Sequence, residues 1–232
     1  AIIGVGGIAE CHIAGYKQNP NVELYAFCDI NEKRLREKGE KHGVVRLYTD
    51  VNEMLAALPE IDAVSVCTWN AAHAPCTIAA LNAGKDVLCE KPMALNAQQA
   101  QEMLDAAKKN HRLLMIGFVR RFGNDCGILS DFIQAGLFGD IYFAKASYLR
   151  RHGCPGGWFC NKELSGGGPL IDLGVHVIDL ARYLCGCPHP VSAYGVTFDR
   201  LGNRPEMKNG PAYAASDAGT VYNVEDFAAG LI

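Results

Sequence analysis

A glycine-rich turn at the start of the chain constrains its fold most strongly. The apolar run Ala1-Ile2-Ile3 leads directly into Gly4-Val5-Gly6-Gly7-Ile8-Ala9. In a strand–turn–helix unit, Gly4 would allow a sharp turn, and Gly6 would let the backbone approach a pyrophosphate at the N-terminus of the helix. Ala9 is small enough for that helix to pack closely on a sheet. The opening therefore predicts a dinucleotide-binding turn, with Gly4, Gly6, Gly7, Ile8 and Ala9 as cofactor-binding candidates.

A carboxylate follows at the distance expected for the ribose of such a nucleotide. Residues 22–28 become fully apolar, as a buried parallel strand does, and Asp29 follows 20 residues beyond Ala9. A carboxylate there would bind the adenosine ribose and repel a 2′-phosphate, which favours NAD. Lys33 and Arg34 could receive a phosphate, so NADP stays open. Alternatively, Asp29 caps the helix expected over residues 31–42.

The first half of the chain alternates strands and helices with short connections. Further strands are expected at residues 46–48, 61–67, 86–90 and 113–118. Asp50 and Asn96 are expected to cap helices, with Gln99 completing a capping box after Asn96. Six β/α units of this kind predict an α/β fold, a doubly wound parallel Rossmann sheet over residues 1–119.

The pattern changes after Val119. A helix is expected at residues 128–135 and another from about Pro169 to Leu184, with alternating strands at 141–151 and 191–199 and a loop at 200–219. This order predicts an α+β domain with a largely antiparallel open sheet over residues 120–232. The chain begins inside a strand without Met, and residues 226–232 resemble the middle of a strand. We therefore expect a fragment truncated at both ends, with that sheet incomplete.

Bulk composition excludes several classes of protein. The 49% hydrophobic and 20% charged residues are typical of a globular enzyme. A net charge of −3 without a basic cluster argues against a nucleic-acid partner, and no apolar stretch is long enough for a membrane span. The ten cysteines contain no C-x-x-C pair, which favours reduced thiols in a cytoplasmic protein without a metal site. A metal or disulfide site of Cys154, Cys160, Cys185 and Cys187 is the alternative.

Several further motifs extend over essentially the whole chain. They are Thr68-Trp69-Asn70 with His73, Ala83-Gly84-Lys85-Asp86-Val87-Leu88-Cys89-Glu90-Lys91-Pro92, Gly117-Phe118-Val119-Arg120-Arg121-Phe122, and Asp172-Leu173-Gly174-Val175-His176-Val177-Ile178-Asp179. Together with the opening turn, they resemble the glucose–fructose oxidoreductase, inositol dehydrogenase and rhizopine-catabolism (Gfo/Idh/MocA) family. The resemblance implies cofactor contacts by Thr68, Asn70, His73 and Glu90. Trp69 departs from the Pro that usually stands at its position.

Three of these residues carry candidate chemistry. Lys91 follows the fifth expected strand, where it could donate to a substrate hydroxyl or instead form a surface pair with Glu90. Asp172 and His176 would share one face of a helix. A neutral imidazole there could take a proton as hydride leaves the same carbon, but a surface ion pair or a core histidine explains the spacing equally well. The resemblance implies that Lys91 contacts cofactor and substrate, that His176 is the acid/base and that Asp172 binds and orients the substrate.

Other side chains keep two interpretations each. Arg120 and Arg121 could contact substrate or form a domain-boundary salt bridge. Residues 165–169 could be a flap or only the turn into a helix. His12 is interpreted as a packing residue, while Trp158 and Phe159 could stack on a sugar ring.

These observations predict an NAD(P)-dependent oxidoreductase. It would transfer hydride between nicotinamide and a secondary alcohol of a sugar, inositol or related polyol. An NAD-dependent glycoside hydrolase of the same fold and a non-catalytic nucleotide-binding regulator are the alternatives. The resemblance further implies a homo-oligomer formed through the C-terminal sheet.

Overall fold

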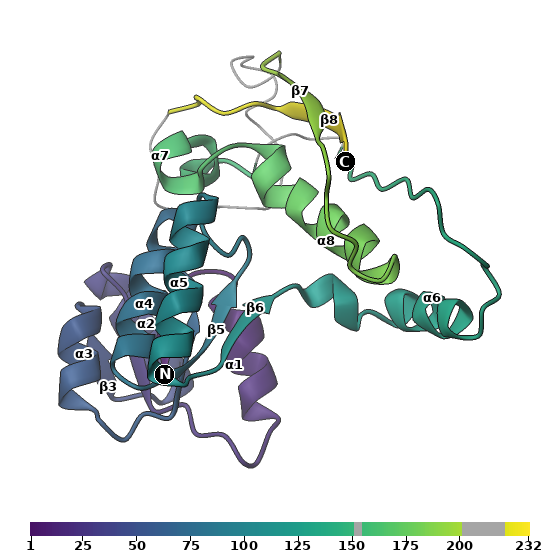
Figure 1. Cartoon of the computed structure of the whole chain (residues 1–232). Coiled ribbons are helices and arrows are strands. Elements are labelled where there is room, and N and C mark those ends of the chain that lie inside the picture. Colours follow the sequence, from purple (N-terminus) through teal and green to yellow (C-terminus); the bar gives the residue numbers. More distant parts are fainter. Residues whose placement is uncertain (151–154, 201–220) are drawn as a thin grey trace. The chain divides into compact units, whose positions relative to one another are not determined.

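The computed structural model describes residues 1–150, 155–200 and 221–232. The chain divides into two compact units, Ala1–Gly117 and Phe118–Ile232 (Figure 1). This division falls two residues before the boundary expected at Val119. Each unit has its own set of helices and strands, and each is described separately below.

The first unit is built on a six-stranded sheet in the order β3-β2-β1-β4-β5-β6, and every neighbouring pair is parallel. Its strands are β1 (Ile2–Ile3), β2 (Ala26–Cys28), β3 (Arg46–Tyr48), β4 (Ala63–Val66), β5 (Asp86–Glu90) and β6 (Leu114–Gly117). The strand order reverses between β1 and β4, and a ligand of a doubly wound sheet binds beyond the carboxyl ends of the strands at that point. The predicted Rossmann sheet is confirmed.

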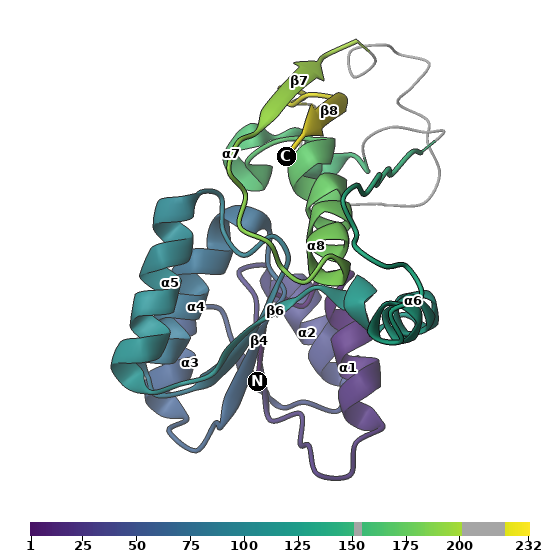
Figure 2. The same cartoon turned by 45° about the vertical axis from the view of Figure 1, so that its right-hand side comes forward.

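Helices cover both faces of this sheet. They are α1 (Ala9–Lys17), α2 (Glu32–His42), α3 (Val51–Ala57), α4 (His73–Asn82) and α5 (Ala97–Asn110), with a short 3₁₀ turn η1 (Asn70–Ala72) before α4. Figure 2 shows α1 and α2 on one face and α3, α4 and α5 on the other. Two helical layers explain why the strands are apolar on both faces.

Polar caps set the starts of three helices. Asn31 begins α2 by accepting a hydrogen bond from the Arg34 backbone N–H, and Asp50 and Asn96 do the same for α3 and α5. The cap of α2 is therefore Asn31, and the alternative assignment of that cap to Asp29 was wrong. Gln99 reaches back to the backbone N–H of Leu95 at 3.2 Å, so it satisfies a second donor at the start of α5.

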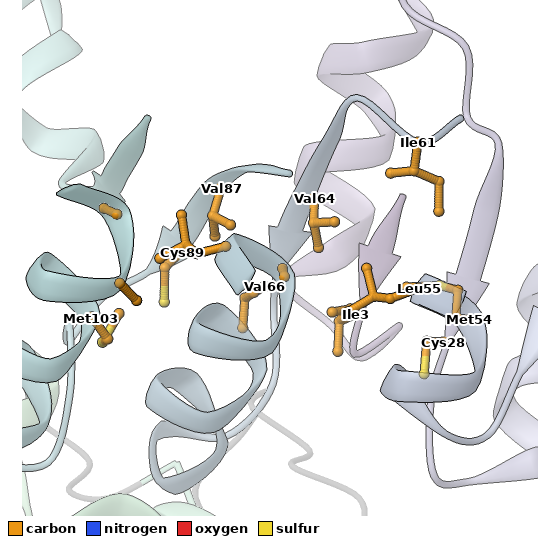
Figure 3. Close-up of a cluster of buried hydrophobic side chains, with 14 of the residues drawn as sticks. Ile3, Cys28, Met54, Leu55, Ile61, Val64, Val66, Val87, Cys89 and Met103 are labelled. Carbon is orange, nitrogen blue, oxygen red and sulfur yellow. The ribbon is translucent and has the colours of Figure 1, made fainter. Parts of the chain in front are cut away.

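The core consists of two apolar layers divided by the sheet. Ile3 and Cys28 face the layer that includes Met54 and Met103 from the helices α3 and α5 (Figure 3). The other layer is made by side chains one residue earlier on the strands, with partners from α1 and α2: Ile2, Val5, Ala9, Ile13, Phe27, Leu35, Val44 and Cys67. Successive strand residues point to opposite faces, so a continuous apolar run fills both layers. This packing fixes the strand ends from which the candidate site is built.

The second unit is an α+β arrangement with a small antiparallel sheet. Its elements are η2 (Val119–Phe122), α6 (Asn124–Gln134), η3 (Gly157–Cys160), α7 (Lys162–Ser165), η4 (Leu170–Gly174), α8 (Val175–Leu184), β7 (Tyr194–Phe198) and β8 (Phe227–Leu231). β7 and β8 pair antiparallel from Tyr194 opposite Leu231 to Phe198 opposite Phe227. The predicted α+β class with antiparallel pairing is confirmed.

Several expected elements of this unit differ in the structure. The described residues 141–150 form no strand, because an alternating sequence becomes a strand only where another strand pairs with its backbone, and no described strand does so. Helix α6 begins at Asn124, earlier than expected. Residues 151–154, including Cys154, and 201–219 of the expected loop lie outside the described residues.

None of the described helices combines the length and the apolar character needed to cross a lipid bilayer.

Candidate cofactor site and active site

The opening turn has the geometry that a nucleotide site needs. Gly4 has a φ of +83°, and a Cβ there would lie 2.8 Å from the carbonyl carbon and oxygen of Cys67, so only glycine fits. A Cβ on Gly6 or Gly7 would meet nothing within 4 Å. The backbone of these two residues therefore borders open space, where a pyrophosphate can approach it.

The helix that follows is open to an anion at its N-terminus. The residue in the N-cap position of α1 is Ile8, whose side chain makes no capping hydrogen bond, and Ala9 is fully buried against the sheet. By contrast, α2, α3 and α5 are capped by their own side chains. The first backbone N–H groups and the positive end of the helix dipole make the start of α1 a suitable place for phosphate groups.

Asp29 lies at the carboxyl end of β2 and is 5% exposed. Its Oδ2 accepts a hydrogen bond of 2.8 Å from the backbone N–H of Val5, and its Oδ1 accepts one of 2.8 Å from that of Asn31. The carboxylate therefore ties the opening turn to the start of α2. This placement, beside the turn, is the one that ribose recognition requires.

Arg34 occupies the remaining acceptor positions of Asp29. Its Nε donates to Oδ2 at 3.1 Å and its Nη2 donates to Oδ1 at 2.8 Å. A carboxylate offers about four lone-pair sites, and the two backbone groups and the guanidinium together fill them. A ribose hydroxyl that binds Asp29 must therefore take the place of an Arg34 N–H.

Thr68, Asn70 and His73, which follow β4, differ in burial and in hydrogen-bond partners. Thr68 donates from its hydroxyl to the carbonyl of Trp69 at 3.1 Å, while Asn70 is 4% exposed. His73 is 1% exposed, and its Nδ1 lies 2.7 Å from the carbonyl oxygen of Pro92. Burial lowers the pKa of His73, so its ring is neutral and donates one N–H. His73 therefore braces the segment of Pro92, and its direct contact with a cofactor stays a prediction.

Glu90 is a second buried acidic residue of the site. Its Oε1 lies 2.8 Å from Nε2 of His12, and its Oε2 accepts a hydrogen bond of 3.2 Å from the backbone N–H of Lys91. Burial by itself raises the pKa of Glu90, but the His12 contact and the Lys91 N–H outweigh it, so the net shift is downward and the carboxylate is charged. Lys91 itself is half-buried, and the peptide bond that joins it to Pro92 is cis.

Asp172 and His176 lie in the second unit, at the junction of two kinds of helix. Residues Leu170–Gly174 form a π-helix, and α8 continues from Val175. A π turn therefore precedes α8 in place of the uniform α-helix expected from Pro169 to Leu184, and the shared face of Asp172 and His176 stays a prediction. Single π turns are frequent at functional sites. Both residues are half-buried.

Glu225 is a residue of this unit that sequence reasoning missed. Its carboxylate accepts hydrogen bonds from the backbone N–H groups of Gly168 at 2.9 Å and Leu170 at 3.3 Å. A Cβ on Gly168 would lie 1.9 Å from the Glu225 carbonyl oxygen. The glycine-rich segment is therefore packed tightly against Glu225, at the start of the helix that carries Asp172. Nothing in the sequence near Glu225 indicates this contact, because its partners lie more than 50 residues earlier.

Arg121 is held within the second unit. It forms a two-pronged pair with Asp179, with Nε to Oδ2 at 2.8 Å and Nη2 to Oδ1 at 2.5 Å, and its guanidinium carbon lies 4.8 Å from the ring centre of Tyr183. This pair joins η2 to α8 and makes Asp179 a structural residue. The rings of Trp158 and Phe159 stack on each other at 3.8 Å.

Two sequence-family models match the chain. Residues 1–118 match the model described as the Gfo/Idh/MocA oxidoreductase family, NAD-binding Rossmann fold, and residues 129–232 match the Gfo/Idh/MocA C-terminal domain. The chain belongs to the Gfo/Idh/MocA oxidoreductase family. The predicted membership is confirmed, and so is NAD as the cofactor of the first unit.

Curated and solved members of the Gfo/Idh/MocA family are similar over most of the chain. D-glucoside 3-dehydrogenase of Escherichia coli K12 is 40% identical over 100% of the chain and 65% of its own length. Myo-inositol 2-dehydrogenase of Thermotoga maritima is 34% identical over 80% of the chain and 54% of its own length. A solved levoglucosan dehydrogenase in complex with NADH is 26% identical, with a TM-score of 0.76 over 99% of the chain and 61% of its own. The chain thus spans about two thirds or less of these relatives.

Most candidate residues of the first unit lie at one edge of its sheet, and their contacts with a cofactor stay predictions. The glycine turn, Asp29, Thr68, Asn70, Glu90 and Lys91 all stand at the carboxyl ends of β1, β2, β4 and β5. The open space beside Gly6 and Gly7 and the uncapped start of α1 fit the pyrophosphate of the NAD that the Gfo/Idh/MocA Rossmann domain binds.

Proposed function

We propose that the protein is an NAD-dependent dehydrogenase that oxidises a secondary alcohol of a sugar, inositol or related polyol. The observation that carries this proposal is the open glycine turn of an NAD-binding domain, in a chain whose similar proteins include glucoside and inositol dehydrogenases. The first unit would bind the dinucleotide, and the second would bind the substrate.

Each candidate residue has a distinct part in this reaction. Bound NAD supplies the acceptor for the hydride. Lys91 donates a hydrogen bond to the substrate hydroxyl, and its positive charge favours the developing alkoxide. His176 accepts the hydroxyl proton, and Asp172 orients the substrate and stabilises the charged imidazole. Gly4, Gly6, Gly7, Ile8 and Ala9 hold the pyrophosphate, while Asp29 binds the adenosine ribose.

A substrate screen tests the proposal directly. The full-length protein is incubated with NAD and a panel of glucosides, free sugars and inositols, and the absorbance of reduced nicotinamide is followed. We expect NADH to accumulate with at least one member of the panel. His176→Ala should lower kcat by about 10²- to 10⁴-fold and leave the Kd of NAD unchanged, because a general base contributes about that factor.

Two outcomes would contradict the proposal. Release of a monosaccharide from a glucoside without NADH would identify an NAD-dependent glycoside hydrolase. Tight NAD binding without turnover of any substrate would identify a non-catalytic regulator. Unchanged kcat in His176→Ala would remove the acid/base role of that residue.

We also propose that the protein acts in the cytoplasm as a homo-oligomer. Eight cysteines of the described residues are free, as expected in a reducing compartment: Cys11, Cys28, Cys67, Cys76, Cys89, Cys126, Cys185 and Cys187. Large apolar side chains are exposed on the two-stranded sheet of the second unit, among them Tyr194, Phe198 and Leu231. Such a surface is suited to an interface between copies. Light scattering coupled to size-exclusion chromatography of the full-length protein measures the mass, and a monomer at micromolar concentration would contradict this state.

A further inference from the structure

A buried hydrogen bond between a histidine and a carboxylate connects the cofactor-binding helix to the candidate catalytic lysine. His12 lies one turn beyond Ala9 on α1, and its Nε2 donates to Oε1 of Glu90 at 2.8 Å, although the two residues are 78 positions apart. Their side chains are only 10% and 8% exposed. His12 is expected from the sequence to be a packing residue, and nothing in the proposed chemistry uses it.

The Glu90 carboxylate is fixed on three sides. One oxygen accepts from His12, and the other accepts from the backbone N–H of Lys91 at 3.2 Å. Behind it, a Cβ on Gly117 of β6 would lie 3.4 Å from both Cδ and Oε1 of Glu90, so any larger residue there would press on the carboxylate. Contacts with α1, β5 and β6 therefore restrict the carboxylate to a single position.

The His12 ring is held as firmly as its partner. It packs edge-on to the ring of Tyr16, with 6.2 Å between centroids, and the Tyr16 hydroxyl lies 2.5 Å from that of Ser65 on β4. The position of Nε2 relative to the sheet is thus set by packing and not only by the pair itself.

Burying a carboxylate and an imidazole is an expensive way to attach a helix to a sheet, because two apolar side chains would do so without a desolvation penalty. The hydrogen-bonded pair provides a directed contact to one backbone group, the Lys91 N–H, and apolar packing would not provide it. That contact connects helix α1, which follows the glycine turn, to the residue that carries the lysine side chain.

We propose that His12 is a positioning residue that acts through Glu90 to hold Lys91 in register with the cofactor-binding helix. The proposal rests on the proposed function, in which Lys91 contacts the substrate. His12 has no part in binding or proton transfer, and it affects kcat by holding Lys91 in position.

Variants of the full-length protein test this proposal, with kcat, KM, the Kd of NAD and the thermal midpoint measured for each. His12→Leu removes the donor and keeps an apolar side chain, and His12→Gln restores an N–H donor. His42→Leu is the matched control, because the His42 side chain is similarly buried, at 8% exposed, and also contacts a carboxylate, that of Glu10 at 3.2 Å, but has no connection to Lys91.

We expect His12→Leu to lower kcat by about 10- to 100-fold, as misplacement of a catalytic group by about 1 Å does. The Kd of NAD should stay near its wild-type value, and His12→Gln should recover most of the kcat. His42→Leu should lower the thermal midpoint but leave kcat unchanged. The proposal is overturned if His12→Leu keeps the wild-type kcat, or if both leucine variants lose kcat in proportion to their loss of stability.

Two further variants keep the test decisive. If His12→Leu does not fold, the double variant with Glu90→Gln removes the unpaired buried charge, and it should fold and show the same loss of kcat. Lys91→Met separates the two proposals. Full activity of Lys91→Met would overturn the proposed role of the lysine, whereas an inactive Lys91→Met beside a fully active His12→Leu would overturn only the role of His12.

Discussion

Asp29 shows how a single residue can satisfy two requirements that compete. Its side chain is 4% exposed, and the guanidinium of Arg34, 20% exposed, pairs with it through two hydrogen bonds. The arginine pairs with a buried carboxylate, and it occupies the acceptor positions that the predicted ribose contact would need. If the ribose binds there, the displaced guanidinium would be available to a 2′-phosphate.

Replacement of Arg34 should therefore shift the preference between the two nicotinamide nucleotides. We predict that Arg34→Ala raises the ratio of the Kd of NADP to that of NAD by about tenfold, because a hydrogen bond to a charged group contributes about 1.5–3 kcal/mol. Isothermal titration calorimetry with each nucleotide measures both constants. Lys33→Ala is the control, since it removes the same charge from the adjacent position. A ratio that falls in Arg34→Ala, or changes equally in Lys33→Ala, would show that Arg34 does not compete for Asp29.

For individual residues, the sequence predicts where a side chain lies in the fold better than it predicts which side chain it contacts. The spacing from the glycine turn places Asp29 correctly at the end of β2, because the length of a β/α/β unit is set by the geometry of strands and helices. Spacing cannot distinguish Lys33 from Arg34 as its partner. That choice depends on which side chain the first turn of α2 directs toward β2, and only the coordinates contain it.

A cluster of charged side chains around Glu10 joins helix α1 to helix α2. Glu10, near the start of α1, contacts Lys38, Lys41 and His42, all in the second half of α2. The hydrogen bond from Lys38 is the largest cause of a lowered pKa of Glu10, from 4.5 to about 2, and Lys41 and His42 add to it. This cluster joins two helices that cover the same face of the sheet.

A lowered carboxylate pKa implies that stability depends on pH. The contribution of Glu10 is complete above about pH 4.5, where the unfolded chain is also ionised, and is lost as the pH falls toward about 2. We predict that Glu10→Gln lowers the free energy of unfolding by about 1 kcal/mol near neutral pH, since the side chain is 32% exposed and solvent screens the pair. Chemical denaturation at a series of pH values measures the difference between variant and wild type.

The difference should shrink steadily below about pH 4.5. Glu32→Gln is the matched control, because Glu32 is 62% exposed, pairs with Arg36 along the same helix α2, and should change stability little at any pH. A difference for Glu10→Gln that is constant from neutral to acid pH would contradict this interpretation of the cluster.

Elements were predicted well where their limits are local. Asp50 and Asn96 begin their helices as expected, because a cap depends only on residues within one turn. Elements whose formation depends on distant partners were predicted less well. The described residues 141–150 have a strand pattern without a pairing strand, and the π turn at Leu170–Gly174 lies beside Glu225, more than 50 residues away.

The whole molecule consists of two units that each contribute part of the proposed chemistry. The first provides the cofactor residues and Lys91, and the second provides Asp172 and His176. The α/β alternation of the first unit was fully readable from the sequence, since each parallel strand is connected to the next by a local helix. The antiparallel pairing of β7 with β8 joins segments about 30 residues apart, and its class could be predicted but not its register.

Two separate compact units should respond separately to damage. A Cβ on Gly168 would lie 1.9 Å from the carbonyl oxygen of Glu225, a contact that no side-chain rotation can relieve. We predict that Gly168→Ala destabilises the second unit by about 1–3 kcal/mol, as overpacking does. Backbone amide exchange, followed by mass spectrometry, should rise in residues 155–200 and 221–232 and stay unchanged in Ala1–Gly117.

The same variant should separate nucleotide binding from turnover. Its Kd for NAD should equal that of the wild type, because the turn at Gly4 belongs to the first unit, whereas kcat should fall because Glu225 and Gly168 support the helix that carries Asp172. Gly127→Ala is the control. A Cβ there meets nothing within 4 Å inside α6, and alanine should stabilise that helix by about 0.5–1 kcal/mol. Faster exchange in both units of Gly168→Ala, accompanied by weaker NAD binding, would show that the two units unfold as one.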